Sequence, residues 1–175
     1  MKIGVVSDTH RNKELLHVVV KWLISEQHIT QLYHLGDDYE DVIDLADERI
    51  EVIQIPGIYH KHYLDGSIKK TLTEHVMELR ILLVHSFDKD VNKNEKTISD
   101  IILYGHTHKA ELKLNDGLLL MNPGHLKSAI DKHEKASFGL IDVQDLIVSA
   151  KIFNLDFEEI MGVKLIRTES GLFKS

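Results

Sequence analysis

Residues 2–10 read Lys-Ile-Gly-Val-Val-Ser-Asp-Thr-His (KIGVVSDTH), and the expected fold follows from this stretch. Residues 3–6 form a short, uninterrupted apolar run, which is typical of a strand buried on both faces of a sheet. The run stops at a polar segment that contains Asp8 and His10. In α/β sheets, ligands collect beyond the carboxyl ends of the strands, so this segment is a candidate functional site.

The first third of the chain alternates between strand and helix patterns. Apolar residues recur at helical spacing over residues 13–25, and a second helix is expected around residues 42–46. Short apolar runs at residues 32–35 and 52–55 predict two more strands. Strand, helix, strand, helix and strand in this order predict a parallel sheet with crossover helices.

The second half of the chain has strand patterns separated by turn signals. Asp116-Gly117 supports the positive φ angles that a tight hairpin turn requires. Seven further strands are predicted, at residues 67–73, 75–84, 101–104, 111–114, 118–121, 137–143 and 146–153. We expect two packed sheets, with an α/β first half and a mostly antiparallel second half.

The length of 175 residues suits one well-buried domain. We expect this domain to span residues 1–155, with residues 156–175 as a C-terminal extension of the same domain. Within the extension, residues 163–166 are expected to form an added strand or a partner contact. The sequence leaves open whether the protein forms a homo-oligomer.

The composition is that of a globular protein, with 43% apolar and 28% charged residues. A net charge of -7 argues against stable nucleic-acid binding, which needs clustered Lys and Arg. A phosphate substrate stays compatible with this charge, because bound metal cations reverse the local field of an acidic site. The chain has no basic leader and no apolar segment of membrane-spanning length, so we expect a cytoplasmic protein without a membrane anchor.

The chain has no cysteine, so any metal must bind to His, Asp, Glu or Asn. Six such side chains follow predicted strands, and they are Asp8, His10, Asp37, His85, His106 and His108. Each has a simpler explanation on its own, such as a helix cap for Asp8 or a turn for Asp37. Six nitrogen and oxygen ligands after apolar strands would rarely gather for structural reasons, so together they predict a metal centre.

These ligands suit divalent ions, of which Mn is the first expectation and Fe, Zn, Ni and Co are alternatives. Two carboxylates and four imidazoles exceed what one catalytic metal takes while it keeps an open position, so two ions that share a carboxylate fit better. Two ions about 3.5–4 Å apart can hold a bridging hydroxide and clamp the attacking and leaving oxygens at phosphorus. The ligand set therefore predicts phosphoester hydrolysis.

Five short motifs resemble those of the calcineurin-like metallophosphoesterases, in particular the small bacterial and archaeal phosphodiesterases. They are SDTH at 7–10, HLGD at 34–37, LLVHS at 82–86, YGHTH at 104–108 and NPG at 122–124. They occur in the order of the family, and the resemblance covers residues 2–153. It implies an α/β fold, namely a four-layer α/β-β/α sandwich of two mixed sheets flanked by helices, with a two-metal centre between the sheet edges.

The same resemblance implies how the ligands divide between two ions. The first ion would be held by Asp8, His10, Asp37 and His108. Asp37 would bridge to the second ion, which His85 and His106 would also hold. Behind these ligands, His34 would either support the site or serve as a buried structural histidine. His125 stands where the family usually has a small residue, and we expect an exposed loop histidine in preference to a substrate contact.

The loop after the third predicted strand departs from the family pattern. The family places Gly-Asn-His/Cys-Asp here, with Asn as a ligand of the second metal, whereas this chain has Gly57-Ile58-Tyr59-His60. Ile58 has no lone pair to give, so the second metal would lose a ligand unless His60 replaces it. His60 is also the best candidate for a catalytic general acid, because imidazole titrates near neutral pH. The alternatives are His62 as the acid, Tyr59 as a contact to a phosphate oxygen, and a solvent-facing loop without a role.

We therefore expect a divalent-metal-dependent phosphodiesterase that hydrolyses a small phosphodiester or phosphate ester by attack of a metal-bridging hydroxide. Two alternatives stay open. One is a catalytically weak or inactive metal-binding scaffold for protein interaction, because a eukaryotic retromer subunit resembles the same family and serves mainly in assembly. The other is a mononuclear metalloenzyme that fills only the first metal site.

Overall fold

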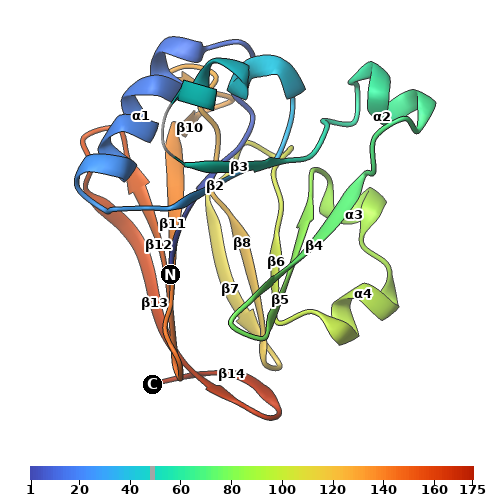
Figure 1. The fold of residues 1–175 in the computed structure, drawn as a ribbon, viewed down its shortest axis with the longest axis vertical. Helices are drawn as coiled ribbons and strands as arrows, with labels where there is room; N and C mark the ends of the chain where they lie inside the picture. Colours follow the sequence, from blue (N-terminus) through green and yellow to red (C-terminus); the bar gives the residue numbers. More distant parts are fainter. Residues whose placement is uncertain (48–49) are drawn as a thin grey trace.

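The computed structural model describes residues 1–47 and 50–175 of the chain. Two sheets pack against each other, with helices on their outer sides (Figure 1). The first sheet contains, in spatial order, β14 (Gly171–Lys174), β13 (Glu159–Thr168), β12 (Ile147–Asn154), β11 (Ser137–Val143), β1 (Lys2–Val6), β2 (Gln31–His34) and β3 (Glu51–Gln54). The second sheet contains β4 (Thr71–Val76), β5 (Leu79–Val84), β6 (Ile101–Leu103), β8 (Leu118–Asn122) and β7 (Glu111–Asn115). A separate ribbon is formed by β9 (Ile130–Asp131) and β10 (Glu134–Lys135).

The helices lie on opposite sides of the pair of sheets. The first sheet is covered by α1 (Lys13–Ser25) and the 3-10 helix η1 (Tyr39–Asp47), and the second by α3 (Phe87–Asp90) and α4 (Lys93–Ile98). The short helix α2 (Lys61–Asp65) follows the loop at the end of β3. None of the helices in the described part of the chain has both the length and the apolar character needed to cross a membrane.

Three separate hydrophobic clusters fill the spaces between these four layers. Tyr33 and Leu83 belong to the cluster between the sheets, and Leu16 of α1 packs with Phe138 on the outer side of the first sheet. Leu82 packs with Phe87 beneath α3. Successive strand residues point to opposite faces, so an uninterrupted apolar run such as that of β5 serves two clusters at once. The predicted four-layer sandwich of two mixed sheets is confirmed.

The pairing of the strands agrees with the predicted halves and adds one parallel segment. β1, β2 and β3 are parallel, as the sequence predicts. The second half is mostly antiparallel, as predicted, but β5, β6 and β8 pair in parallel, which the sequence did not predict. The crossover from β5 to β6 runs through α3 and α4, which are too short to give a helical pattern in the sequence. The hairpin of β11 and β12 joins the first sheet, where β11 pairs antiparallel with β1.

The predicted boundaries of helices and strands agree best with the structure where the sequence contains a local signal. The predicted helix at residues 13–25 is α1, and Asn12 caps it by accepting the amide of Leu15. The predicted break between strands at residue 74 lies too early, because β4 and β5 meet at Met77 and Glu78. Both residues have positive φ, 46° and 68°, and non-glycine residues give no sequence signal for such a turn.

Residues 159–174 extend the edge of the first sheet as the hairpin of β13 and β14. The strand expected at residues 163–166 is therefore part of β13. Leu165 and Leu172 are fully buried in the cluster between the sheets, whereas the neighbouring Ile166 is 44% exposed. The hairpin thus contributes apolar side chains to the main core.

We expect Leu165→Ala to lower the free energy of unfolding by about 2–5 kcal/mol, because it leaves a cavity between the sheets. Ile166→Ala is the matched control in the same strand, and it should cost less than about 1 kcal/mol. Chemical denaturation followed by circular dichroism measures both changes. Equal effects of the two substitutions would show that the hairpin does not belong to the core.

Candidate metal centre

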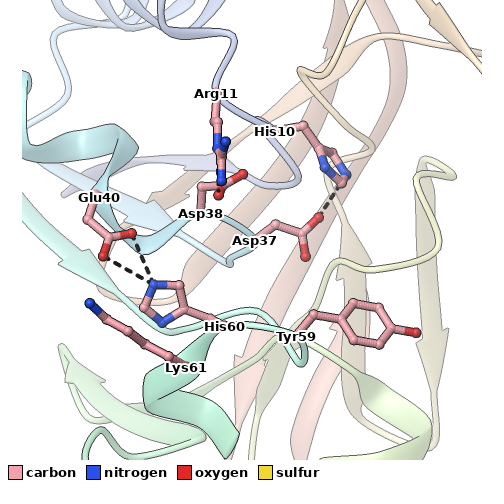
Figure 2. A pocket seen from close by; sticks show the side chains of 8 residues that line it. All are labelled: His10, Arg11, Asp37, Asp38, Glu40, Tyr59, His60 and Lys61. Atoms are coloured by element: carbon pink, nitrogen blue, oxygen red, sulfur yellow. Dashed lines mark hydrogen bonds and ion pairs between the residues drawn. The ribbon is translucent and has the colours of Figure 1, made fainter.

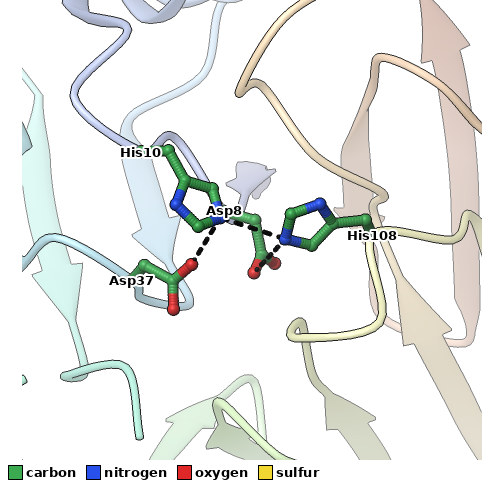
Figure 3. Close-up of side chains that lie close together, drawn as sticks. All are labelled: Asp8, His10, Asp37 and His108. Atoms are coloured by element: carbon green, nitrogen blue, oxygen red, sulfur yellow. Dashed lines mark hydrogen bonds and ion pairs between the residues drawn. The ribbon is translucent and has the colours of Figure 1, made fainter. Parts of the chain in front are cut away.

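Four side chains meet beyond the carboxyl ends of strands from both sheets, and they are Asp8, His10, Asp37 and His108 (Figure 3). One nitrogen or oxygen atom of each lies within 4.8 Å of the others. His10 Nε2 is 2.7 Å from Asp37 Oδ2 and 3.0 Å from His108 Nε2, and His108 Nε2 is 3.3 Å from Asp8 Oδ1. The structure brings together the four residues that the family resemblance assigns to the first metal.

Unusual backbone conformations orient several side chains at the site. Asp8, His10, His106 and His108 have φ of 53°, 46°, 69° and 63°, in the left-handed region that non-glycine residues rarely adopt. Such residues cost about 1–3 kcal/mol each and persist only where surrounding contacts hold them. One of these contacts is the hydrogen bond from the Asp8 amide to Gly36 O at 2.7 Å, and another runs from the His106 amide to Asp8 Oδ2 at 2.9 Å. Their concentration at one place is a sign of a functional site.

A glycine permits the closest approach between the two sheets at this site. A Cβ atom on Gly105 would lie 1.9 Å from Ser7 Oγ and 2.6 Å from Asp8 Oδ2. Only glycine therefore lets the YGHTH segment reach the carboxylate that follows β1. Ser7 Oγ in turn donates a hydrogen bond to Asp8 Oδ2 at 2.5 Å, which fixes one oxygen of this carboxylate and leaves the other facing the cluster.

His85 lies fully buried between the two carboxylates. Its Nδ1 is 2.6 Å from Leu35 O, so Nδ1 donates and the lone pair of Nε2 faces the site. Nε2 is 2.9 Å from Asp37 Oδ1 and 4.0 Å from Asp8 Oδ1. Within the described residues both His85 Nε2 and Asp8 Oδ1 are buried without a hydrogen-bond partner.

These unpaired atoms fit a bound cation. Buried polar atoms nearly always have partners, and a divalent ion about 2.0–2.2 Å from each donor would supply one. The donor set consists of carboxylate oxygens and imidazole nitrogens, which suit the metals predicted from the sequence. The residues therefore fit at least one divalent ion.

The electrostatics of the cluster also favour positive charge. Burial raises the pKa of Asp37, but its contacts with His10 and His85 outweigh burial and hold the pKa well below its usual range. Burial lowers the pKa of His85 and of His108, yet the neighbouring carboxylates outweigh burial and raise both values. The carboxylates thus create a negative potential in which a cation is stabilised.

His106 stands beside this group. Its ring centroid is 5.2 Å from that of His85, and burial followed by repulsion from His85 lowers its pKa. Of the residues assigned to the second metal, Asp37 and His85 are in contact and His106 is adjacent. Ile58, which stands at the usual Asn position, is buried and 3% exposed.

His60 is turned away from the cluster (Figure 2). Its Nε2 is 3.0 Å from Glu40 Oε2, and its Nδ1 accepts the amide of His62 at 3.3 Å, which caps α2. Both ring nitrogens are therefore engaged, and neither takes the place of the missing ligand. His60 nevertheless lines the same pocket as His10 and Asp37, which has a volume of about 620 Å³.

Two other histidines near the site are buried. The expected exposed position of His125 is wrong, because the side chain is fully buried and its ring centroid is 5.2 Å from that of His108. The ribbon of β9 and β10 accounts for this burial, since Glu134 O lies 3.2 Å from His125 Nε2. His34 lies 3.2 Å from Thr9 Oγ1, and burial lowers its pKa to about 4, so it supports the segment next to Asp8 as a neutral residue.

One carboxylate of the site had no sequence signal. Asp131 Oδ2 lies 2.6 Å from His108 Nδ1, and Lys127 Nζ lies 2.7 Å from Asp131 Oδ1. The hydrogen bond from Lys127, followed by that from His108, lowers the pKa of Asp131 to about 2. A carboxylate in this position holds the imidazole of a metal ligand in the tautomer whose Nε2 can bind. Asp131 lies in β9, outside any apolar run, and only the folded chain places it near His108.

The protein thus has two packed sheets in an α/β fold, and carboxylates and imidazoles at the strand ends form a candidate metal site. This combination places it in the class of α/β proteins with a candidate metal centre at the sheet edges. The chain matches the Calcineurin-like phosphoesterase superfamily domain over residues 1–146, and it belongs to this family. It is also 22% identical to a phosphodiesterase of Methanocaldococcus jannaschii, over 71% of this chain and 83% of that protein. The resemblance to the small phosphodiesterases that the motifs indicate is confirmed.

Solved structures show the same fold. The phosphoesterase Yfce of E. coli superimposes with a TM-score of 0.70 at 20% identity, covering 93% of this chain and 98% of that one. Vps29 of Entamoeba histolytica, solved with Zn²⁺, superimposes with a TM-score of 0.67 at 22% identity, covering 95% and 99%. At these identities the similarity establishes the fold.

We expect Asp131→Asn to weaken Mn²⁺ binding about 10- to 100-fold, because His108 loses the carboxylate that orients it. Asp145→Asn, at an exposed position distant in sequence, is the control and should leave the affinity unchanged. Isothermal titration calorimetry of the metal-free proteins measures both affinities. An unchanged affinity in Asp131→Asn would refute the orienting role.

Proposed function

We propose that this protein is a divalent-metal-dependent phosphodiesterase that acts on small phosphodiesters, with other phosphate esters as lesser substrates. The observation that carries the proposal is the cluster of Asp8, His10, Asp37 and His108 with buried, unpaired donor atoms directed into it. Membership of the calcineurin-like phosphoesterase family supports the same activity.

Each residue of the site has a defined task in this proposal. Asp8, His10, Asp37 and His108 would hold one ion, and His85 and His106 would hold a second together with Asp37. The chemistry that bound Mn²⁺, or Fe, Zn, Ni or Co as alternatives, would supply there is Lewis acidity and a more acidic water nucleophile. Leu35 O and Asp131 fix the two imidazoles of His85 and His108, so the donor atoms are oriented before the substrate arrives.

The leaving group of a phosphodiester needs a proton, and His60 is our candidate to donate it. His60 lines the pocket that also contains His10 and Asp37. Its contact with Glu40 provides a partner for a protonated ring. In this role His60 rotates from Glu40 toward the leaving oxygen when a substrate is bound.

We expect the protein to hydrolyse bis-p-nitrophenyl phosphate with Mn²⁺, and Asp37→Ala to lower kcat/KM about 100-fold or more. The substitution removes the carboxylate that both ions share, and metal ions contribute several kcal/mol to such reactions. His133→Ala, at an exposed histidine, is the control and should retain full activity. Release of p-nitrophenolate at 405 nm, roughly its absorbance maximum, is the assay.

A metal-binding scaffold is the second candidate function, and the replacement of a ligand by the buried Ile58 favours it. The two functions differ in turnover. If the wild-type protein binds two ions and hydrolyses no phosphodiester with any of the metals named above, the result favours the scaffold over the enzyme.

Ile58→Asn should raise the affinity for a second divalent ion by about 10-fold or more, because it offers an amide oxygen at the position of the missing ligand. Ile58→Ala is the control, since it also removes the buried isoleucine side chain but offers no donor atom. Elemental analysis after anaerobic purification, together with calorimetry, gives the number of ions and their affinities. Identical stoichiometry and affinity in all three proteins would contradict this account of the loop.

A further inference from the structure

The pocket beside the metal cluster contains one exposed aromatic ring. Tyr59 lines this pocket together with His10 and Asp37, and its ring points away from His60 (Figure 2). Tyr59 is 78% exposed. Its ring centroid is 6.5 Å from that of His106, which places the ring within reach of a group that is joined to phosphorus by one ester linkage.

The surrounding backbone holds Tyr59 in this exposed position. On one side, Ile58 is buried, and the Gly57 amide donates to Asp37 O at 3.2 Å. On the other side, the His60 amide donates to Gly57 O at 2.9 Å, and the His60 side chain caps α2. Tyr59 is therefore presented from a fixed loop, and a tyrosine has only two side-chain torsions to order when it binds a ligand.

The other walls of the pocket are charged and mostly paired. Arg11 contacts Asp38 at 3.3 Å and His60 contacts Glu40 at 3.0 Å, so these polar groups already have partners. Lys89 Nζ lies 5.9 Å from the centroid of the Tyr59 ring, where it adds positive charge near the site of an anionic ester. The ring of Tyr59 is thus the one large apolar surface among the residues that line this pocket in the described part of the chain.

We propose that Tyr59 forms an aromatic subsite that selects phosphate esters carrying a planar aromatic group, which stacks on its ring while the phosphate occupies the metal cluster. This inference rests on the proposed function and adds a substrate class to it. The planar group is a simple aryl ring or a nucleobase, since both offer the same stacking face. The loop that lacks the metal-binding asparagine thereby supplies substrate recognition.

Two pairs of probes test the subsite without turnover. Phenylphosphonate and cyclohexylphosphonate differ in the planarity of one ring, and adenosine 5′-monophosphate and ribose 5-phosphate differ in the base. Calorimetry with the Mn²⁺-loaded protein should give tighter binding of the aromatic member, by about 5- to 30-fold. A preference within one pair only would support the subsite and identify that aromatic source as its ligand.

The variants separate stacking from other roles. Tyr59→Ala should abolish the preference, and Tyr59→Phe should retain it because the ring remains. Leu64→Ala, at a 69% exposed residue of α2 outside the pocket, is the matched control and should behave as the wild type.

The results also distinguish failure of the subsite from failure of the activity. Equal binding within each pair, an unaltered preference in Tyr59→Ala, or loss of the preference in Tyr59→Phe would overturn the subsite and leave the proposed phosphodiesterase intact. If none of the four probes binds while bis-p-nitrophenyl phosphate is still hydrolysed, the subsite alone falls. Absence of that hydrolysis with every metal named above overturns the proposed function instead.

Discussion

The contacts of His85 with the end of β2 tie the two sheets together at the site. His85 follows the end of β5 in the second sheet, and it meets Leu35 O and Asp37, which follow β2 of the first sheet. The His106 amide makes a parallel link to Asp8. Hydrogen bonds that involve charged groups are strong when buried, and loss of one partner costs about 1–3 kcal/mol. The spacing of the two carboxylates depends on these links, and so does everything that the site can bind.

Much of the site could be predicted because its signals are local. Each of Asp8, Asp37 and His85 follows directly on an apolar run that reads as a buried strand, and the carboxyl ends of such strands form ligand sites. The helix α1 was equally predictable, since its apolar spacing and its asparagine cap lie in one continuous segment. The four-layer arrangement followed from the resemblance of the motifs to a known family, which the comparisons confirm.

The parts that could not be predicted depend on contacts between distant segments. The parallel pairing of β5 with β6 depends on the crossover through α3 and α4, which have four and six residues and are too short for a periodic pattern. The burial of His125 and the contact of Asp131 with His108 both come from the β9 and β10 ribbon, which has no apolar run of its own. The left-handed backbone conformation at His106 and His108 could not be predicted, because neither residue is a glycine and the sequence gives no other signal for it.

The position of Asp131 on that ribbon has a dynamic consequence. A ribbon of two short strands is marginally stable on its own, and this one pairs with neither sheet. Segments of this kind open locally at a much lower free energy than the whole domain unfolds. Each opening separates Asp131 from His108 and releases the imidazole from its fixed tautomer while both sheets stay folded. The fraction of molecules with a correctly aligned histidine is then set by the local stability of the ribbon. Mild heating or a low concentration of denaturant would therefore reduce this fraction before the hydrophobic core unfolds.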